Sequence, residues 1–173
     1  MPKKKLPFRE FAWTPELAYA VGLLTTDGNL SKDGRHITMR SSDRDLLVTF
    51  RTCLALRNSR IARTNNNGYS ERPSYRIQFS NVQLYNWLAT VGLKPAKTHS
   101  LEALTIPDEC FRDFLRGHLD GDGSIITYTD YYNVRKNPKY VYTRVWVRFC
   151  SASRSHLEWI RATTARLLGV RGT

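Results

Sequence analysis

Two aspartates occupy matching places in two similar stretches of the sequence, and they are the strongest candidates for chemistry. Asp27 follows the mostly apolar stretch 17–26, and Asp122 follows the stretch 114–121, 95 residues further along the chain. If the fold brings the two carboxylates together, they repel each other unless a cation lies between them. Paired carboxylates suit a hard divalent cation such as Mg²⁺, with waters and phosphate oxygens as the remaining ligands.

Glycines around both aspartates indicate how the acids are positioned. Each aspartate has a glycine five residues before it, Gly22 or Gly117, and another immediately after it, Gly28 or Gly123. A glycine inside a helix costs about 1 kcal/mol relative to alanine, so Gly22 and Gly117 are expected where two helix backbones approach closely. Two helices that cross there would bring their carboxyl-terminal ends together. The pattern therefore predicts a helix pair that carries both acids at one end.

In these stretches the chain resembles the LAGLIDADG homing endonucleases that carry two motifs in a single chain. Residues 115–123 match the motif that names the family, and residues 20–28 match it with Thr25 in place of the first aspartate. The resemblance implies a metal-dependent endonuclease that hydrolyses double-stranded DNA at a long, specific site, encoded within an intron or an intein. The simpler alternative is a pair of core helices that end in acids. Repetition of the motif at domain spacing favours the family.

The resemblance also implies roles for individual residues. Asp27 and Asp122 would be catalytic, each binding the metal together with a neighbouring backbone carbonyl, that of Thr26 or Gly121. Lys97 best matches the position of a lysine that assists catalysis by stabilising charge, with Lys94 as the next candidate, and a phosphate contact is an equal alternative for such a residue. The implied cofactor is Mg²⁺, and Mn²⁺ or Ca²⁺ is expected to fit the same site.

The elements that position these residues follow from hydrophobic periodicity and turn signals. Thr14 and Pro15 start a helix that runs to Thr26, and a second motif helix starts at Pro107 and Asp108. A first α-β-β-α-β-β-α unit is completed by strands over 28–31, 36–41, 57–64 and 74–80 and by helices over 43–56 and 82–91. The start of that order is repeated by strands over 124–132 and 140–150 and by a helix over 153–168.

These elements predict an α+β fold of two pseudo-symmetric αββαββα units, with antiparallel saddle sheets and the two motif helices at the seam. The second unit has no counterpart of the second hairpin and closing helix, so we expect it to be truncated at its carboxyl end or completed by another chain. Otherwise a monomer with an internal pseudo-twofold axis is expected. The predicted divisions are a basic arm over 1–13, a first unit over 14–93, a connector over 94–106 and a second unit over 107–173.

Polar side chains on one face of the predicted hairpins favour duplex DNA as the partner. The major groove admits a two-stranded ribbon, in which arginine can pair with guanine and glutamine with adenine. A solvated sheet face is the alternative for any single residue, and the recurrence on several strands favours DNA. The candidate DNA contacts are Lys32, Arg35, Arg40, Arg60, Arg63, Arg72, Arg76, Gln78, Arg135, Lys136, Arg144, Trp146 and Arg148.

Composition agrees with a nucleic-acid partner. The chain has 27 lysines and arginines against 15 aspartates and glutamates, a net charge of +12, which favours a polyanion. Three cysteines without a CxxC pair predict neither a disulfide framework nor structural zinc, which favours an intracellular location, cytoplasmic in a prokaryote or in an organelle. The four histidines are scattered in the sequence, and core packing is expected to account for most tyrosines and tryptophans. No apolar run is long enough for a membrane span.

Two other functions share this fold. An RNA-splicing maturase would keep the acids and use the surface for intron RNA. A non-cleaving DNA-binding protein would use the saddle without hydrolysis, and the presence of both acids speaks against it.

Overall fold

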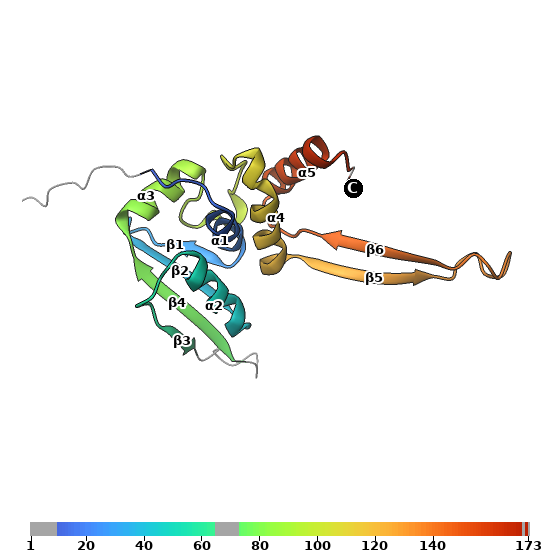
Figure 1. Ribbon diagram of the computed structural model, residues 1–173, viewed down its shortest axis with the longest axis horizontal. Helices are drawn as coiled ribbons and strands as arrows, with labels where there is room; N and C mark the ends of the chain where they lie inside the picture. Colours follow the sequence, from blue (N-terminus) through green and yellow to red (C-terminus); the bar gives the residue numbers. More distant parts are fainter. Residues whose placement is uncertain (1–9, 65–72, 171, 173) are drawn as a thin grey trace, which may run out of the picture.

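The computed structural model describes residues 10–64, 73–170 and 172 of the chain. Its elements alternate between helices and antiparallel strands (Figure 1), which confirms the predicted α+β class. Their bounds are α1 Pro15–Thr26, β1 Gly28–Leu30, β2 His36–Ser41, α2 Arg44–Cys53, β3 Ile61–Thr64, β4 Ser74–Ser80, α3 Val82–Val91, the 3-10 helix η1 Lys97–His99, α4 Asp108–Asp122, β5 Ser124–Asp130, β6 Tyr142–Arg148 and α5 Arg154–Leu168.

Helices α1 and α4 lie side by side at the centre of the molecule (Figure 1). They cross at the two helical glycines, as predicted: a Cβ added to Gly22 would overlap the carbonyl oxygen of Phe114, and one added to Gly117 would overlap that of Tyr19. Helix α1 is buried at every position over residues 17–25, as expected for a helix that other elements enclose on all sides.

A polar contact between the same helices gives Asp120 a structural role. The Tyr19 hydroxyl donates a hydrogen bond to Asp120 Oδ2 at 2.8 Å, and the Arg116 guanidinium lies 4.6 Å from the Tyr19 ring centroid. Burial, reinforced by this hydrogen bond, raises the pKa of Tyr19. In the first motif Thr25 stands in place of the acid, and its hydroxyl donates to the Gly22 carbonyl of its own helix.

The first sheet has the strand order β1-β2-β4-β3, with every neighbouring pair antiparallel. Across the central β2–β4 pair, Arg40 lies opposite Arg76 and Thr38 lies opposite Gln78. Because side chains alternate along a strand, these residues share one polar face and the intervening residues form an apolar face. Helix α2 covers the apolar face (Figure 1), and its Phe50 ring lies 6.5 Å from that of Phe79.

The second unit contributes a two-stranded sheet that projects away from the helices (Figure 1). This hairpin, residues 124–148, is called the arm below. The apolar side of the arm differs from its counterpart in the first unit: Ile125 and Val147 are exposed, whereas Leu30 and Ile37, an equivalent pair in the first hairpin, are buried. Among the described residues, no strand or helix covers that side of the arm in the way that α2 covers the first sheet.

Several predicted helices and strands were longer than the observed ones, each for a local reason. Helix α2 ends at Cys53 instead of continuing to residue 56, because Ala55 adopts a left-handed φ of 50° that reverses the chain. Strand β3 begins at Ile61, since residues 57–60 turn instead of pairing. At the tip of the arm, turns over 131–141 end the strands at Asp130 and Tyr142. The turn that the Asn-Gly sequence within residues 65–68 predicts between β3 and β4 lies outside the described residues.

None of the described helices is both long and apolar enough to cross a bilayer.

Candidate two-acid site and nucleic-acid interface

The two predicted acids lie at the carboxyl-terminal ends of the crossing helices. Asp27 is the residue after α1, and Asp122 is the last residue of α4. The carboxylates are close enough to repel each other: burial, and then the neighbouring Asp122 charge, raise the pKa of Asp27 to about 6, although nearby Lys97 opposes the shift. The helix crossing has thus placed two like charges at one end of the seam, where an added cation would relieve the repulsion.

Lys97 supplies a positive charge to this site. Its side chain is buried, and its ammonium donates hydrogen bonds to the carbonyl oxygens of Gly28 at 2.7 Å and Thr26 at 3.4 Å. Burial lowers the pKa of Lys97, and the charges of Asp122 and Asp27 oppose that shift. Helix η1, which holds Lys97, was not predicted from the sequence. It follows Ala96, whose left-handed φ of 54° turns the connector toward the seam.

The donors at this site fit a hydrated divalent cation. No group of three or more histidine, cysteine, aspartate or glutamate side chains suited to a metal was found among the described residues, and two carboxylates are a sufficient protein contribution for Mg²⁺, which retains waters and binds phosphate oxygens. Asp27, Asp122 and the Gly121 carbonyl would hold it. The Thr26 carbonyl, which was predicted to bind the cation, accepts a hydrogen bond from the Lys97 ammonium. When bound, such a cation would activate a water and neutralise charge on a phosphate.

The polar side of the first sheet, called the groove face, leads to Asp27. By strand register it includes Asn29, His36, Thr38, Arg40, Arg76, Gln78 and Ser80. One open hollow of about 340 Å³ is lined by Arg40, Arg76 and Gln78 together with Asp27. A second, of about 400 Å³, is lined by Arg60 and shares Arg76 and Gln78 with the first. Basic and amide side chains therefore continue without interruption to one of the two acids.

The other predicted DNA contacts of the first unit do not all reach the groove face. Arg63 lies opposite Tyr75, whose ring packs against the core, so Arg63 belongs to the side of the sheet that α2 covers. Lys32 and Arg35 are exposed in the β1–β2 turn. Arg35 forms an ion pair with Asp33 at 3.5 Å. Arg72 lies outside the described residues.

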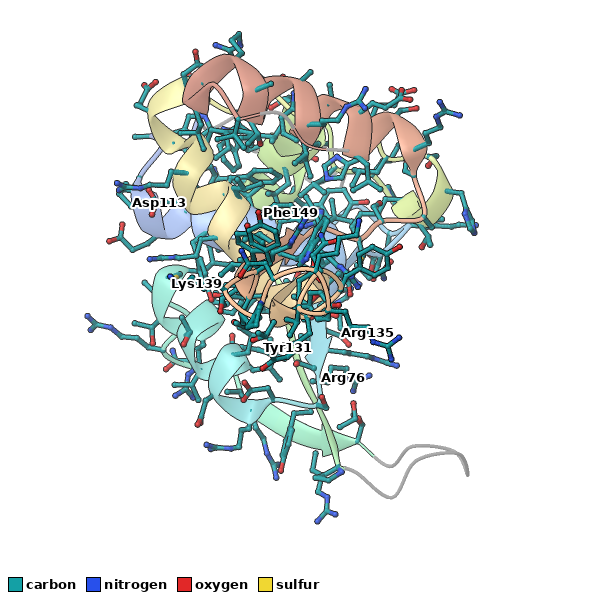
Figure 2. The ribbon with its side chains drawn as sticks, turned by 90° about the vertical axis from the view of Figure 1, so that its right-hand side faces the viewer. Arg76, Asp113, Tyr131, Arg135, Lys139 and Phe149 are labelled. Atoms are coloured by element: carbon teal, nitrogen blue, oxygen red, sulfur yellow. The ribbon has the colours of Figure 1, made fainter. Side chains whose placement is uncertain are left out.

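The predicted contacts of the second unit all lie on the arm. Arg144, Trp146 and Arg148 share one face of β6, while Arg135 and Lys136 lie at the tip, which Figure 2 shows end-on. Arg144 forms an ion pair with Asp130 at 3.2 Å.

The expectation that core packing explains most tyrosines and tryptophans is wrong for the arm. Tyr128, Tyr142 and Trp146 are exposed there, because no strand or helix among the described residues covers their side of this two-stranded sheet. The alternating pattern of β5 and β6 contained a signal of this exposure, because these rings stand at every second position and share that face with arginines.

Sequence reasoning also missed a buried histidine pair behind Lys97. The rings of His118 and His156 stack with their centroids 5.3 Å apart, although the residues are far apart in sequence. Burial, followed by the proximity of His156, lowers the pKa of His118 to about 4, so its ring is neutral at neutral pH. The signal available in the sequence was the position of His118, which stands in the second motif where the first motif has Leu23.

Comparisons with known proteins support the fold. No model of a known protein family matches the sequence, and no curated protein matches it. The chain is similar to full-length DUF199/WhiA from Thermatoga maritima, with a TM-score of 0.57 and 12% sequence identity over 95% of this chain and 49% of that one. It is also similar to the N-terminal LAGLIDADG domain of DUF199/WhiA, with a TM-score of 0.56 and 13% identity over 93% of this chain and 70% of that one. The chain therefore has a LAGLIDADG fold and spans about half the length of full-length WhiA.

Proposed function

We propose that this chain binds duplex DNA through the groove face of its first sheet. The observation that carries the proposal is the shared hollow in which Arg40, Arg76 and Gln78 meet Asp27. Arginine and glutamine at these positions can donate to base edges in the major groove and to phosphates. The excess of 12 positive charges over the whole chain adds a general attraction to a polyanion.

Binding is tested with two arginines on opposite sides of the same sheet. Arg76→Ala removes a groove-face guanidinium, whereas Arg63→Ala removes one from the α2 side. Duplexes would first be enriched from a random-sequence library, and affinity would then be measured by fluorescence anisotropy. We expect Arg76→Ala to weaken binding about tenfold, the cost of one good base contact, and Arg63→Ala to change it less than about twofold. Equal losses would contradict binding by the groove face.

We propose further that the two-acid site hydrolyses the bound phosphodiester, as a site-specific endonuclease. Asp27 and Asp122 would hold a divalent cation beside the scissile phosphate, and the Lys97 ammonium would add positive charge near the same group. Support comes from the repulsion between the two carboxylates, which a cation would relieve. Without such a cation the two acids would repel the DNA backbone.

Non-cleaving DNA binding is the second candidate, and the position of Lys97 favours it. Its ammonium already neutralises part of the acidic charge and occupies the Thr26 carbonyl. The likeness to the WhiA structures reaches the fold alone and is compatible with either candidate.

The enriched duplex separates the two candidates when incubated with Mg²⁺ or Mn²⁺. If the chain is an endonuclease, the parent protein cuts both strands. Asp122→Asn then abolishes cutting, because it removes a ligand of the cation. It retains binding, because it also removes a charge that repels phosphate. Mn²⁺ should also raise the melting temperature of the parent more than that of Asp122→Asn. Binding by the parent without cutting in either metal would instead establish the non-cleaving protein.

A further inference from the structure

The two hairpins of this pseudo-repeat present different chemistry on equivalent faces. In the first unit, strands β1, β2 and β4 place only hydrogen-bonding side chains on the groove face. Ser124, which follows Asp122 at the same distance as Asn29 follows Asp27, begins the equivalent face of the arm. By register, this face carries Ser124, Ile126, Tyr128 and Asp130 on β5 and Tyr142, Arg144, Trp146 and Arg148 on β6. It is called the stacking face below.

Aromatic rings on the stacking face are open to solvent. Tyr128 is 52% exposed, Tyr142 50% and Trp146 46%. Arg144 stands between Tyr142 and Trp146 along β6 and lies directly opposite Tyr128, and Arg148 follows Trp146 on the same face. Several adjacent exposed rings are unusual on a soluble surface and mark a binding site.

The tip of the arm continues the same composition. Tyr131 and Tyr132 are exposed there, and the ring of Tyr140 stacks on that of Tyr142 with centroids 6.2 Å apart and planes 22° apart. Figure 2 shows Tyr131 at the tip together with Arg135 and Lys139. Flat rings and positive charge thus alternate along β6 and recur at the tip, while on β5 the acid Asp130 pairs with Arg144.

This composition fits bases that are not stacked on one another. In a duplex the face of each base is covered by its neighbours, so a protein meets base edges and phosphates, which require the hydrogen-bonding groups found on the groove face. Aromatic rings gain most from the open face of an unpaired base, while interleaved cations contact the backbone. We infer that the arm binds single-stranded nucleic acid by stacking unpaired bases on Tyr128, Tyr142 and Trp146. This inference does not rest on duplex binding by the first sheet.

Trp146 provides both a probe and a variant for the test. The intact chain would be titrated with oligo(dT) and with oligo(U), each of about 15 nucleotides, a length that an aromatic and basic groove can bind. Stacking should quench the fluorescence of Trp146, which is more exposed than Trp13, Trp87 or Trp159. We expect Trp146→Ala to weaken binding of the oligonucleotide about tenfold or more, in line with the loss of one stacked base, and Trp146→Phe to retain most of the affinity.

Val145→Ala is the matched control, because Val145 neighbours Trp146 on the same strand but lies on the other side of the arm. It should leave the affinity for the oligonucleotide within about twofold of the parent value. Trp146→Ala should lower the affinity for the oligonucleotide far more than the affinity for duplex DNA, which separates this inference from the proposed function. Similar affinity for oligo(dT) and oligo(U) would show that the arm does not read the 2′-hydroxyl, and a preference that persists between oligo(dU) and oligo(U) would identify DNA or RNA as the natural strand. The inference is overturned if neither oligonucleotide binds, or if Trp146→Ala and Val145→Ala have equal effects.

Discussion

Asp27 shows at the scale of one residue how the proposed site and the stability of the fold oppose each other. In the folded chain its pKa is raised to about 6, mainly by burial and then by Asp122, so the folded state holds its proton more tightly than the unfolded state does. Between about pH 4 and pH 6 the contribution of this group to stability therefore decreases as the pH rises. Above pH 6 the folded protein carries a half-buried, repelled carboxylate at a net cost.

Asp27→Asn should accordingly stabilise the protein at neutral pH. The amide removes the charge and keeps the shape, and after allowance for solvent screening the gain should be about 1–2 kcal/mol at pH 7.5. At pH 4 the parent carboxyl is mostly protonated, so the two proteins should have nearly equal stability. Thermal unfolding followed by circular dichroism at both pH values checks this. A gain of the same size at pH 4 would show that ionisation of Asp27 is not its cause.

At the scale of elements, the crossing of α1 and α4 depends on two positions that carry no side chain. An alanine in place of Gly117 gains about 1 kcal/mol in helix propensity, yet its Cβ would overlap the backbone carbonyl of Tyr19, which cannot rotate away. The helices would have to separate, and Asp122 would move away from Asp27 with them. The packing of the helices and the geometry of the two-acid site are thus set by the same contact.

Gly117→Ala should therefore destabilise the fold by about 3 kcal/mol or more, the upper range for overpacking in a core. Arg112→Ala, on the exposed side of the same helix, should change the stability by less than about 0.5 kcal/mol. Urea unfolding of both variants and the parent is the measurement. A Gly117→Ala protein as stable as the parent would mean that the two helices can pack without this close approach.

At the scale of the whole molecule, the positive charge is distributed over two separate surfaces. The groove face and its hollows contribute Arg40, Arg60 and Arg76, and the arm carries the arginines and lysines of the stacking face and tip. The two surfaces differ in what accompanies the charge, since the first offers amides and hydroxyls and the second offers aromatic rings.

Binding of duplex DNA should consequently depend strongly on salt. Each neutralised phosphate contributes about −0.9 to the slope of log K against log salt concentration, so the three arginines of the groove face and its hollows predict a slope near −3 or steeper. Binding of the oligonucleotide to the arm should depend less steeply on salt, because each contact on a single strand contributes about −0.7 and stacking adds affinity that salt does not screen. Titrations between 50 and 300 mM KCl, about the range used for such slopes, provide the check. A flat response for the duplex would show that the basic surface does not bind phosphates.

The sequence by itself determined the repeated motif, the helix crossing and the order of elements, because each depends on local patterns. Gly22, Gly117 and the two aspartates stand at spacings that only a helix pair explains, and the alternation of β2 and β4 identified the face with Arg40. Hydrophobic periodicity and turn residues act over a few positions, so a single sequence contains them in full.

Only the tertiary structure decided which residues share a surface. Strand register moved Arg63 to the α2 side of the sheet, the connector brought the ammonium of Lys97 onto the Thr26 and Gly28 carbonyls, and packing joined His118 to His156. The rings of the arm are exposed because no neighbouring element among the described residues covers them. No local pattern in the sequence indicates that absence. These features depend on contacts between residues far apart in the chain, and such contacts follow from the packing of whole elements rather than from the spacing within any one of them.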